Sequence, residues 1–152
     1  MTKKLGVGVG IASFLMGGIL GSVVTFARVG STFADMASDA MAQWLESEAY
    51  SKYRYGSYSV AKAALLKQAT FVEAVATRTS QERTRRLAGA AGLSYARLAL
   101  AAERAHQLED NGLYLPKARD GFLRSGNALS DDQMRELVVG LDRAWDRELV
   151  GE

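Results

Sequence analysis

The sequence predicts an all-α protein, with one amino-terminal transmembrane helix followed by a small bundle of four to five helices. Three observations predict this fold class. Residues 5–27 form a stretch of 23 residues without a charged side chain. Apolar residues recur every three or four positions along most of the remaining chain, and no segment alternates apolar and polar residues as a strand would. The roughly 125 residues after the apolar stretch suffice for one compact domain.

The apolar stretch is long enough to cross a membrane. A helix rises about 1.5 Å per residue, so residues 5–27 can span a hydrocarbon core of about 30 Å. The stretch exceeds the run of roughly 7–15 apolar residues in a cleaved signal peptide, which favours an uncleaved anchor. Lys3 and Lys4 precede it, and positively charged flanks stay in the cytoplasm. We therefore expect residues 1–4 in the cytoplasm and residues 28–152 in the periplasm, with the anchor in a bacterial inner membrane.

Glycine is frequent within this stretch. Small residues four positions apart allow a second membrane helix to approach closely. The sequence thus predicts contact with another transmembrane helix and with membrane lipid. The predicted contact residues are Gly6, Gly10, Gly17, Gly18, Gly21 and Ser22.

The charges argue against nucleic-acid binding. All 17 acidic residues follow Arg28, and 17 of the 19 basic residues lie at or after it. Residues 28–152 are therefore net neutral, whereas phosphate binding requires an excess of Lys and Arg on one face. Arg83, Arg85 and Arg86 form the densest basic cluster. They are either the solvated first turn of a helix or a docking patch for an acidic partner or lipid headgroups.

Four helices are predicted before the last one. Residues 31–55 carry a helical stripe, and Tyr55–Ser57 signal a turn around Gly56. A second stripe follows over residues 58–77. Thr79 and Glu82 resemble a capping box that opens a third helix, which is expected to reach about Leu108. Its alanine- and glycine-rich composition predicts close packing against neighbouring helices. A loop at residues 109–112 is then expected, with a short helix over residues 116–124.

The last helix is predicted from its amino-terminal signals. Ser130 and Gln133 have the spacing of a second capping box. Asp131 and Asp132 suit the positive end of a helix dipole. Met134, Val138 and Leu141 continue an apolar stripe.

The segment from Ser47 to Leu65 resembles the central part of a tetratricopeptide repeat (TPR). Gly56 and Tyr58 match the glycine and the aromatic residue of the turn, and Ala61 and Ala49 match the small residues where the two helices touch. The resemblance implies a TPR-like helical domain with a protein-binding or scaffold role.

A second, degenerate repeat is weaker. Ala99 and Ala102 would lie in its first helix, and Leu115 to Ala118 would open its second. Ala61 and Ala118 are 57 residues apart, against a usual repeat of about 34.

The sequence contains no recognisable catalytic set. His106 is the only histidine, and Glu103 precedes it by three residues. A di-iron carboxylate bundle requires a second Glu-x-x-His pair, which one histidine does not allow. Without cysteine, thiolate metal sites and disulfides are excluded. We expect no enzymatic activity, cofactor, metal or small-molecule substrate; an enzyme would need a closed pocket around Glu103 and His106.

Aromatic residues cluster around the first turn. They either fill the core between two helices or form a surface for a protein partner, because Tyr and Trp are enriched at interfaces. An aromatic side chain that is more than half exposed favours the interface. The candidate partner-binding residues are Trp44, Tyr50, Tyr53, Tyr55, Arg83, Arg85 and Arg86.

The sequence therefore predicts a non-catalytic accessory or assembly subunit of a larger membrane complex. Respiratory, photosynthetic, secretion and envelope machinery are all possible hosts, and other subunits of the complex are the expected partners. The alternative is a free membrane-tethered adaptor that captures a soluble peptide or protein. An enzyme with an unrecognised site is a weaker alternative.

Overall fold

The computed structural model describes residues 32 and 34–150. The chain consists of two compact units, Met1–Ala40 and Met41–Glu152. In the first unit, the described residues are helical. In the second unit, residues 41–55 form a helix, which we call the 41–55 helix. The helices α2 (Tyr58–Ala76), α3 (Gln81–Arg104), α4 (Leu108–Ser125) and α5 (Asp131–Val150) follow.

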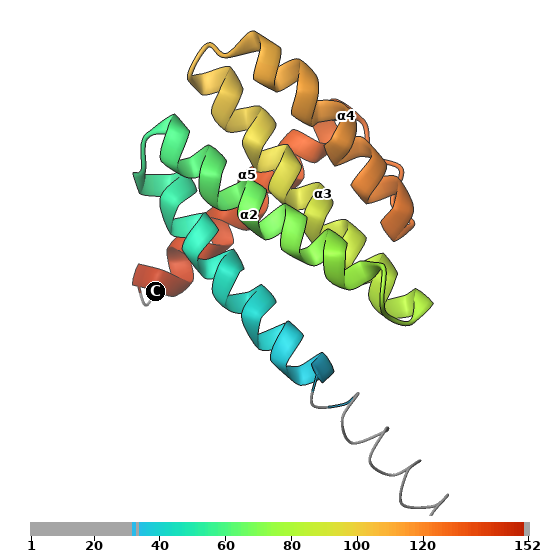
Figure 1. Cartoon of the computed structure of the whole chain (residues 1–152). Helices are drawn as coiled ribbons and strands as arrows, with labels where there is room; N and C mark the ends of the chain where they lie inside the picture. The colour runs from blue at the N-terminus through green and yellow to red at the C-terminus, as the bar shows by residue number, and fades with distance from the viewer. Residues whose placement is uncertain (1–31, 33, 151–152) are drawn as a thin grey trace, which may run out of the picture. The chain divides into compact units, whose positions relative to one another are not determined.

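The second unit is a helical bundle. The 41–55 helix, α2, α3 and α4 run up and down as successive neighbours, and α5 passes behind them (Figure 1). Contacts between α3 and both α2 and α4 are extensive, whereas α5 touches α3 and α4 more sparsely. Helix α3 therefore lies at the centre, and each residue from Ser94 to Leu100 is buried. This burial confirms the close packing expected from its small side chains.

The predicted fold class is wrong in one respect. Among the residues that the structure describes, no helix is both long and apolar enough to cross a membrane. The physical reason is charge: α2 carries Lys62, Lys67 and Glu73, and the first turns of α3 carry four charged residues within positions 82–86. The stretch predicted to span the membrane, residues 5–27, lies outside the described residues, as does the predicted cytoplasmic segment 1–4.

The first predicted turn is confirmed. The 41–55 helix ends at Tyr55, and α2 begins at Tyr58. A Cβ atom built on Gly56 would lie 2.5 Å from the Lys52 carbonyl oxygen. The tight turn therefore requires a residue without a side chain at this position.

The capping box predicted at Thr79 and Glu82 is wrong. Helix α3 begins one residue later than such a box requires, with Ser80 at the N-cap and no side-chain cap. Instead, the Thr84 hydroxyl donates a hydrogen bond of 3.0 Å to the Ala76 carbonyl at the end of α2. A contact between neighbouring helices thus takes the place of a local cap.

The loop predicted at residues 109–112 is also wrong. Helix α3 ends at Arg104 rather than Leu108, and the connection lies at residues 105–107, where His106 has a φ of 56°. Residues 109–112 instead form the start of α4. Glu109 and Asp110 stabilise this helix end through its dipole, and the buried stripe that follows sustains the helix through packing.

Pro116 lies inside α4 rather than at the start of a helix. The predicted short helix over residues 116–124 is therefore the second half of a longer one. This finding also removes the predicted opening of a second repeat at Leu115 to Ala118.

Two glycines bring α3 and α4 together. A Cβ atom built on Gly121 would lie 2.6 Å from the Cα atom of Gly92. A Cβ atom on Gly92 would in turn lie 3.0 Å from the backbone nitrogen of Phe122. The two backbones thus meet at a point where a side chain on either helix would push the helices apart.

The second predicted capping box is confirmed. The Ser130 amide donates to the Gln133 side-chain oxygen at 2.9 Å, and the Gln133 amide donates to the Ser130 hydroxyl at 3.3 Å. Met134 and Val138 then enter the core. The start of α5 is consequently fixed by local hydrogen bonds, and its direction by packing against α3.

Candidate functional site

The structure separates the predicted aromatic cluster into two groups. Tyr50 and Tyr53 are buried in the core, whereas Trp44 is 55% exposed and Tyr55 is 76% exposed. The exposure criterion thus selects Trp44 and Tyr55 as interface candidates. Tyr50 and Tyr53 instead support the domain from inside.

The buried tyrosines surround an ion pair between α3 and α5. Arg97 is 1% exposed, and its Nη2 lies 3.0 Å from the Asp142 Oδ1 atom. The Arg97 guanidinium also stacks over the Tyr50 ring at 4.9 Å from its centre. The Tyr50 hydroxyl lies 3.0 Å from the Asp142 carbonyl oxygen and 2.9 Å from Oδ1 of Asp146. This polar centre joins the 41–55 helix, α3 and α5.

Burial controls the ionisation of these tyrosines. Burial and the hydrogen bond to Asp146 raise the pKa of Tyr50 to about 12. Burial also raises the pKa of Tyr53, and the neighbouring Asp142 charge adds to this effect. On α3, burial and the Glu73 carboxylate raise the pKa of Tyr95 to about 12. All three hydroxyls therefore stay protonated to a higher pH in the folded domain than in the unfolded chain.

We expect the domain to lose stability as the pH rises from 10 to 12. In the unfolded chain tyrosine releases its proton near pH 10, while folded Tyr50 and Tyr95 hold theirs to about 12. The unfolded state then binds fewer protons, so the free energy of unfolding falls with pH. Urea denaturation at several pH values from 8 to about 12 measures this slope. Tyr50→Phe should show a shallower slope, and an unchanged slope would contradict the assignment to Tyr50.

Trp44 belongs to an exposed stripe on the 41–55 helix. Met41, Trp44 and Tyr55 are spaced so that they share one face of this helix, and all three are exposed. The Lys67 ammonium of α2 lies over the Trp44 ring at 5.0 Å from its centre and 3.2 Å from an oxygen of Glu48. The Trp44 ring thus has a cation–π contact on one side, and it remains exposed.

A groove lies beside this stripe. It has a volume of about 360 Å³ and runs between the 41–55 helix and α2. Val60, Ala63 and Ala64 form its apolar part, and Lys52 and Lys67 border it. We use the name Trp44 surface for the exposed apolar residues of this region: Met41, Trp44, Tyr55 and Val60.

The arginine cluster does not form one patch. Arg83 is buried, whereas Arg85 and Arg86 are exposed. Arg85 and Arg86 line a second groove of about 450 Å³ between the 41–55 helix, α3, α4 and α5, but Glu46 and Glu82 line it too. The opposing charges make this groove neutral, so its electrostatics select no acidic partner.

The residues that resemble a repeat turn lie together. Ala49 and Ala61 are buried in the core cluster, on either side of the turn at Gly56. Tyr58 donates a hydrogen bond to Asp110 of α4, and the Lys62 ammonium lies 2.6 Å from the same carboxylate oxygen. These two donors lower the pKa of Asp110. The turn is thereby joined to the start of α4.

Glu103 and His106 do not share a pocket. Glu103 forms an ion pair with Arg135 at 2.9 Å. His106 is exposed in the connection between α3 and α4 and lines none of the three cavities described in the second unit. In the described part of the chain, no group of three or more His, Asp or Glu side chains is arranged to hold a metal ion.

The predicted membrane contact residues cannot be placed. Gly6, Gly10, Gly17, Gly18, Gly21 and Ser22 lie outside the described residues.

Sequence reasoning missed Arg97, Asp142, Val60 and Lys67. An arginine within the Leu- and Ala-rich part of α3 signals a buried charge, and this signal could have identified Arg97. Asp142 lies 45 residues away, and no local pattern marks it as the partner. Val60 joins the Trp44 surface, and Lys67 contacts the Trp44 ring, only because α2 packs beside the 41–55 helix.

Comparisons with models of protein families, with curated proteins and with solved structures yield no match to this chain. Its function is therefore inferred from its own residues and geometry.

Proposed function

We propose that this chain is a non-catalytic accessory subunit that binds another protein through the Trp44 surface. The observation that carries the proposal is the exposed indole of Trp44, whose ring lies beneath the Lys67 ammonium. Tryptophan is among the residues that contribute most binding energy in protein interfaces.

The Trp44 surface suits an elongated partner segment. Met41 and Tyr55 are separated by 14 residues of one helix, which corresponds to about 21 Å at 1.5 Å per residue. Val60 of α2 and the neighbouring groove extend the surface sideways. A partner helix could place apolar side chains along this length, in the manner of a helix bound in a hydrophobic groove. The partner is accordingly a protein rather than nucleic acid, in line with the neutral charge of residues 28–152.

Truncating the Trp44 side chain should weaken binding of the partner protein. We expect Trp44→Ala to reduce recovery of the co-purifying protein at least tenfold, since truncating an interface tryptophan commonly costs about 2 kcal/mol or more. The measurement is affinity purification of the full chain from its natural host, with quantitative mass spectrometry. Leu123→Ala on α4 provides the control, because Leu123 is also exposed but lies outside the Trp44 surface. Equal recovery with both variants, or a wild-type chain that purifies as a monomer, would overturn the proposal.

The open groove beside Trp44 also favours the second candidate, an adaptor that captures a soluble peptide. A subunit and an adaptor differ in the lifetime of the complex that each forms with its partner. A subunit should co-purify with its partner at fixed stoichiometry, whereas an adaptor should lose its ligand during extended washing. The host complex and the predicted location at a bacterial inner membrane, with the domain in the periplasm, stay predictions.

A further inference from the structure

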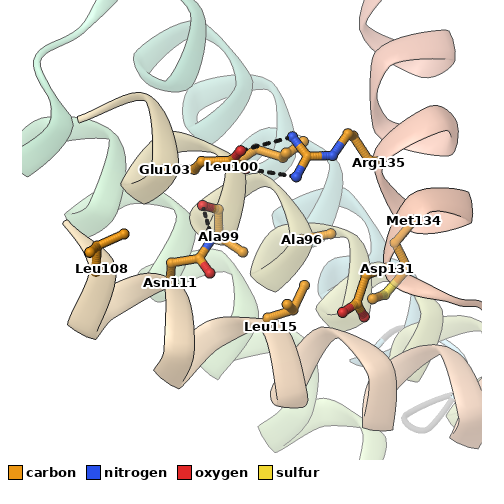
Figure 2. A pocket seen from close by; sticks show the side chains of 10 residues that line it. All are labelled: Ala96, Ala99, Leu100, Glu103, Leu108, Asn111, Leu115, Asp131, Met134 and Arg135. Carbon is orange, nitrogen blue, oxygen red and sulfur yellow. Dashed lines mark hydrogen bonds and ion pairs between the residues drawn. The ribbon is translucent and has the colours of Figure 1, made fainter. Parts of the chain in front are cut away.

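A separate pocket lies where α3, α4 and α5 converge (Figure 2). Its volume is about 300 Å³. Most of its lining is apolar and comes from all three helices, with Ala96 and Leu100 from α3, Leu115 from α4 and Met134 from α5. The space exists because α3 presents small side chains here while α5 packs only sparsely against α3 and α4.

Three polar links surround the pocket, and each joins a different pair of helices. Arg135 of α5 binds Glu103 of α3 through two contacts of 2.9 and 3.2 Å, which Figure 2 shows. Arg119 of α4 lies 2.6 Å from Asp131 of α5. The side-chain nitrogen of Asn111 on α4 donates to the Ala99 carbonyl of α3 at 2.9 Å. Together the links hold the three helices in position around the space.

The rim determines which ligands fit. Each charged side chain that lines the pocket is already paired with an oppositely charged side chain, so none is left to bind an ion. Burying an ion against the apolar lining would also cost desolvation energy. Asn111 donates one of its two side-chain N–H groups to the Ala99 carbonyl, and its side-chain oxygen stays available as a hydrogen-bond acceptor at the pocket wall. The best ligand is therefore uncharged, largely apolar and able to donate one hydrogen bond.

The volume sets the size of the ligand. Small-molecule pockets begin at about 300 Å³, and an apolar cavity of about 150 Å³ already holds benzene. A pocket of about 300 Å³ suits a molecule with two fused rings. We infer that this pocket is a binding site for a small, neutral, mainly apolar alcohol or phenol. The inference is independent of the Trp44 surface, which lies on other helices.

The test uses 2-naphthol as the probe and Met134 as the reporter. Met134 lines the pocket, whereas Met41 is exposed on the 41–55 helix. We expect 2-naphthol to shift the methyl resonance of Met134 in the full chain, labelled at methionine and kept in a nonionic detergent. The shift should saturate below about 1 mM, and the Met41 resonance should remain in place. No saturable shift at Met134 would overturn the inference.

A variant that fills the pocket tests whether 2-naphthol binds there. Leu115→Trp places a larger side chain in the pocket and should weaken binding of 2-naphthol at least tenfold. Leu123→Trp is the matched control on the same helix, at an exposed site away from the pocket. Because both variants are measured in the same detergent, uptake of the probe by the detergent affects them equally. Equal affinity in the two variants would overturn the assignment to this pocket.

Two comparisons test the chemical class and do not depend on the filling variant. We expect 2-naphthoate, which has the same rings and a negative charge, to bind at least tenfold more weakly than 2-naphthol. Asn111→Leu should remove the preference for 2-naphthol over naphthalene, since the acceptor is lost. Equal binding of 2-naphthoate, or an unchanged preference in Asn111→Leu, would overturn the proposed ligand class.

Discussion

Replacing Asp142 by alanine should destabilise the domain by about 3–5 kcal/mol, because the substitution leaves the Arg97 guanidinium buried without its carboxylate. Arg97 is almost fully buried, and Asp142 is its charged partner at 3.0 Å. The same substitution frees α5 from α3 at the point where Tyr50 also contacts α5. Urea denaturation of the full chain, followed by circular dichroism, measures the loss.

The control for Asp142→Ala is Asp120→Ala. Asp120 pairs with Arg124 at 2.8 Å, but both side chains are more than half exposed. An exposed ion pair contributes only about 0–1 kcal/mol, so this variant should remain close to the wild type. A similar small effect of Asp142→Ala would show that water reaches Arg97. The double variant Arg97→Met with Asp142→Leu should recover part of the loss, since neither charge is then left buried alone.

Gly121→Ala should lower the free energy of unfolding by about 2–3 kcal/mol, although alanine normally stabilises helices. The added Cβ atom would lie 2.6 Å from the Cα atom of Gly92 and 3.0 Å from the Ala88 carbonyl oxygen. Both neighbours are backbone atoms of α3, so the helices must separate along their contact. Thermal and urea denaturation of the full chain measure the change.

Gly112→Ala on the same helix is the matched control. A Cβ atom at Gly112 meets nothing within 4 Å. The free energy of unfolding of this variant should therefore rise by about 0.5–1 kcal/mol, because alanine has the better helix propensity. If both variants shifted stability in the same direction by the same amount, the close contact between α3 and α4 would be refuted.

Local signals in the sequence predicted several elements correctly. The turn around Gly56, the extent of α2 and the capping box of Ser130 and Gln133 follow from residues within a few positions of one another. Such signals are reliable because the hydrogen bonds that they describe close within one helical turn. The loop predicted at residues 109–112 failed because tertiary packing of Tyr114, Ala118 and Phe122 sustains α4 through a polar, glycine-containing start.

The candidate site was only partly predictable. The sequence grouped Trp44, Tyr50, Tyr53 and Tyr55 because they lie close along one helix. Their helical positions differ, however, so Tyr50 and Tyr53 face the core while Trp44 and Tyr55 face solvent. Which side of the helix becomes the core depends on where α2, α3 and α5 pack.

By itself, the sequence determined the helical class of the domain, its neutral charge and the presence of an aromatic cluster beside a glycine turn, since these follow from composition and from the period of the apolar residues. Only the tertiary structure decided which aromatic residues stay exposed, that Arg97 pairs with Asp142, and that Gly92 meets Gly121. These contacts join residues that are distant in the chain. Their free energies depend on burial and on distances between helices, and neither quantity is encoded in any local pattern.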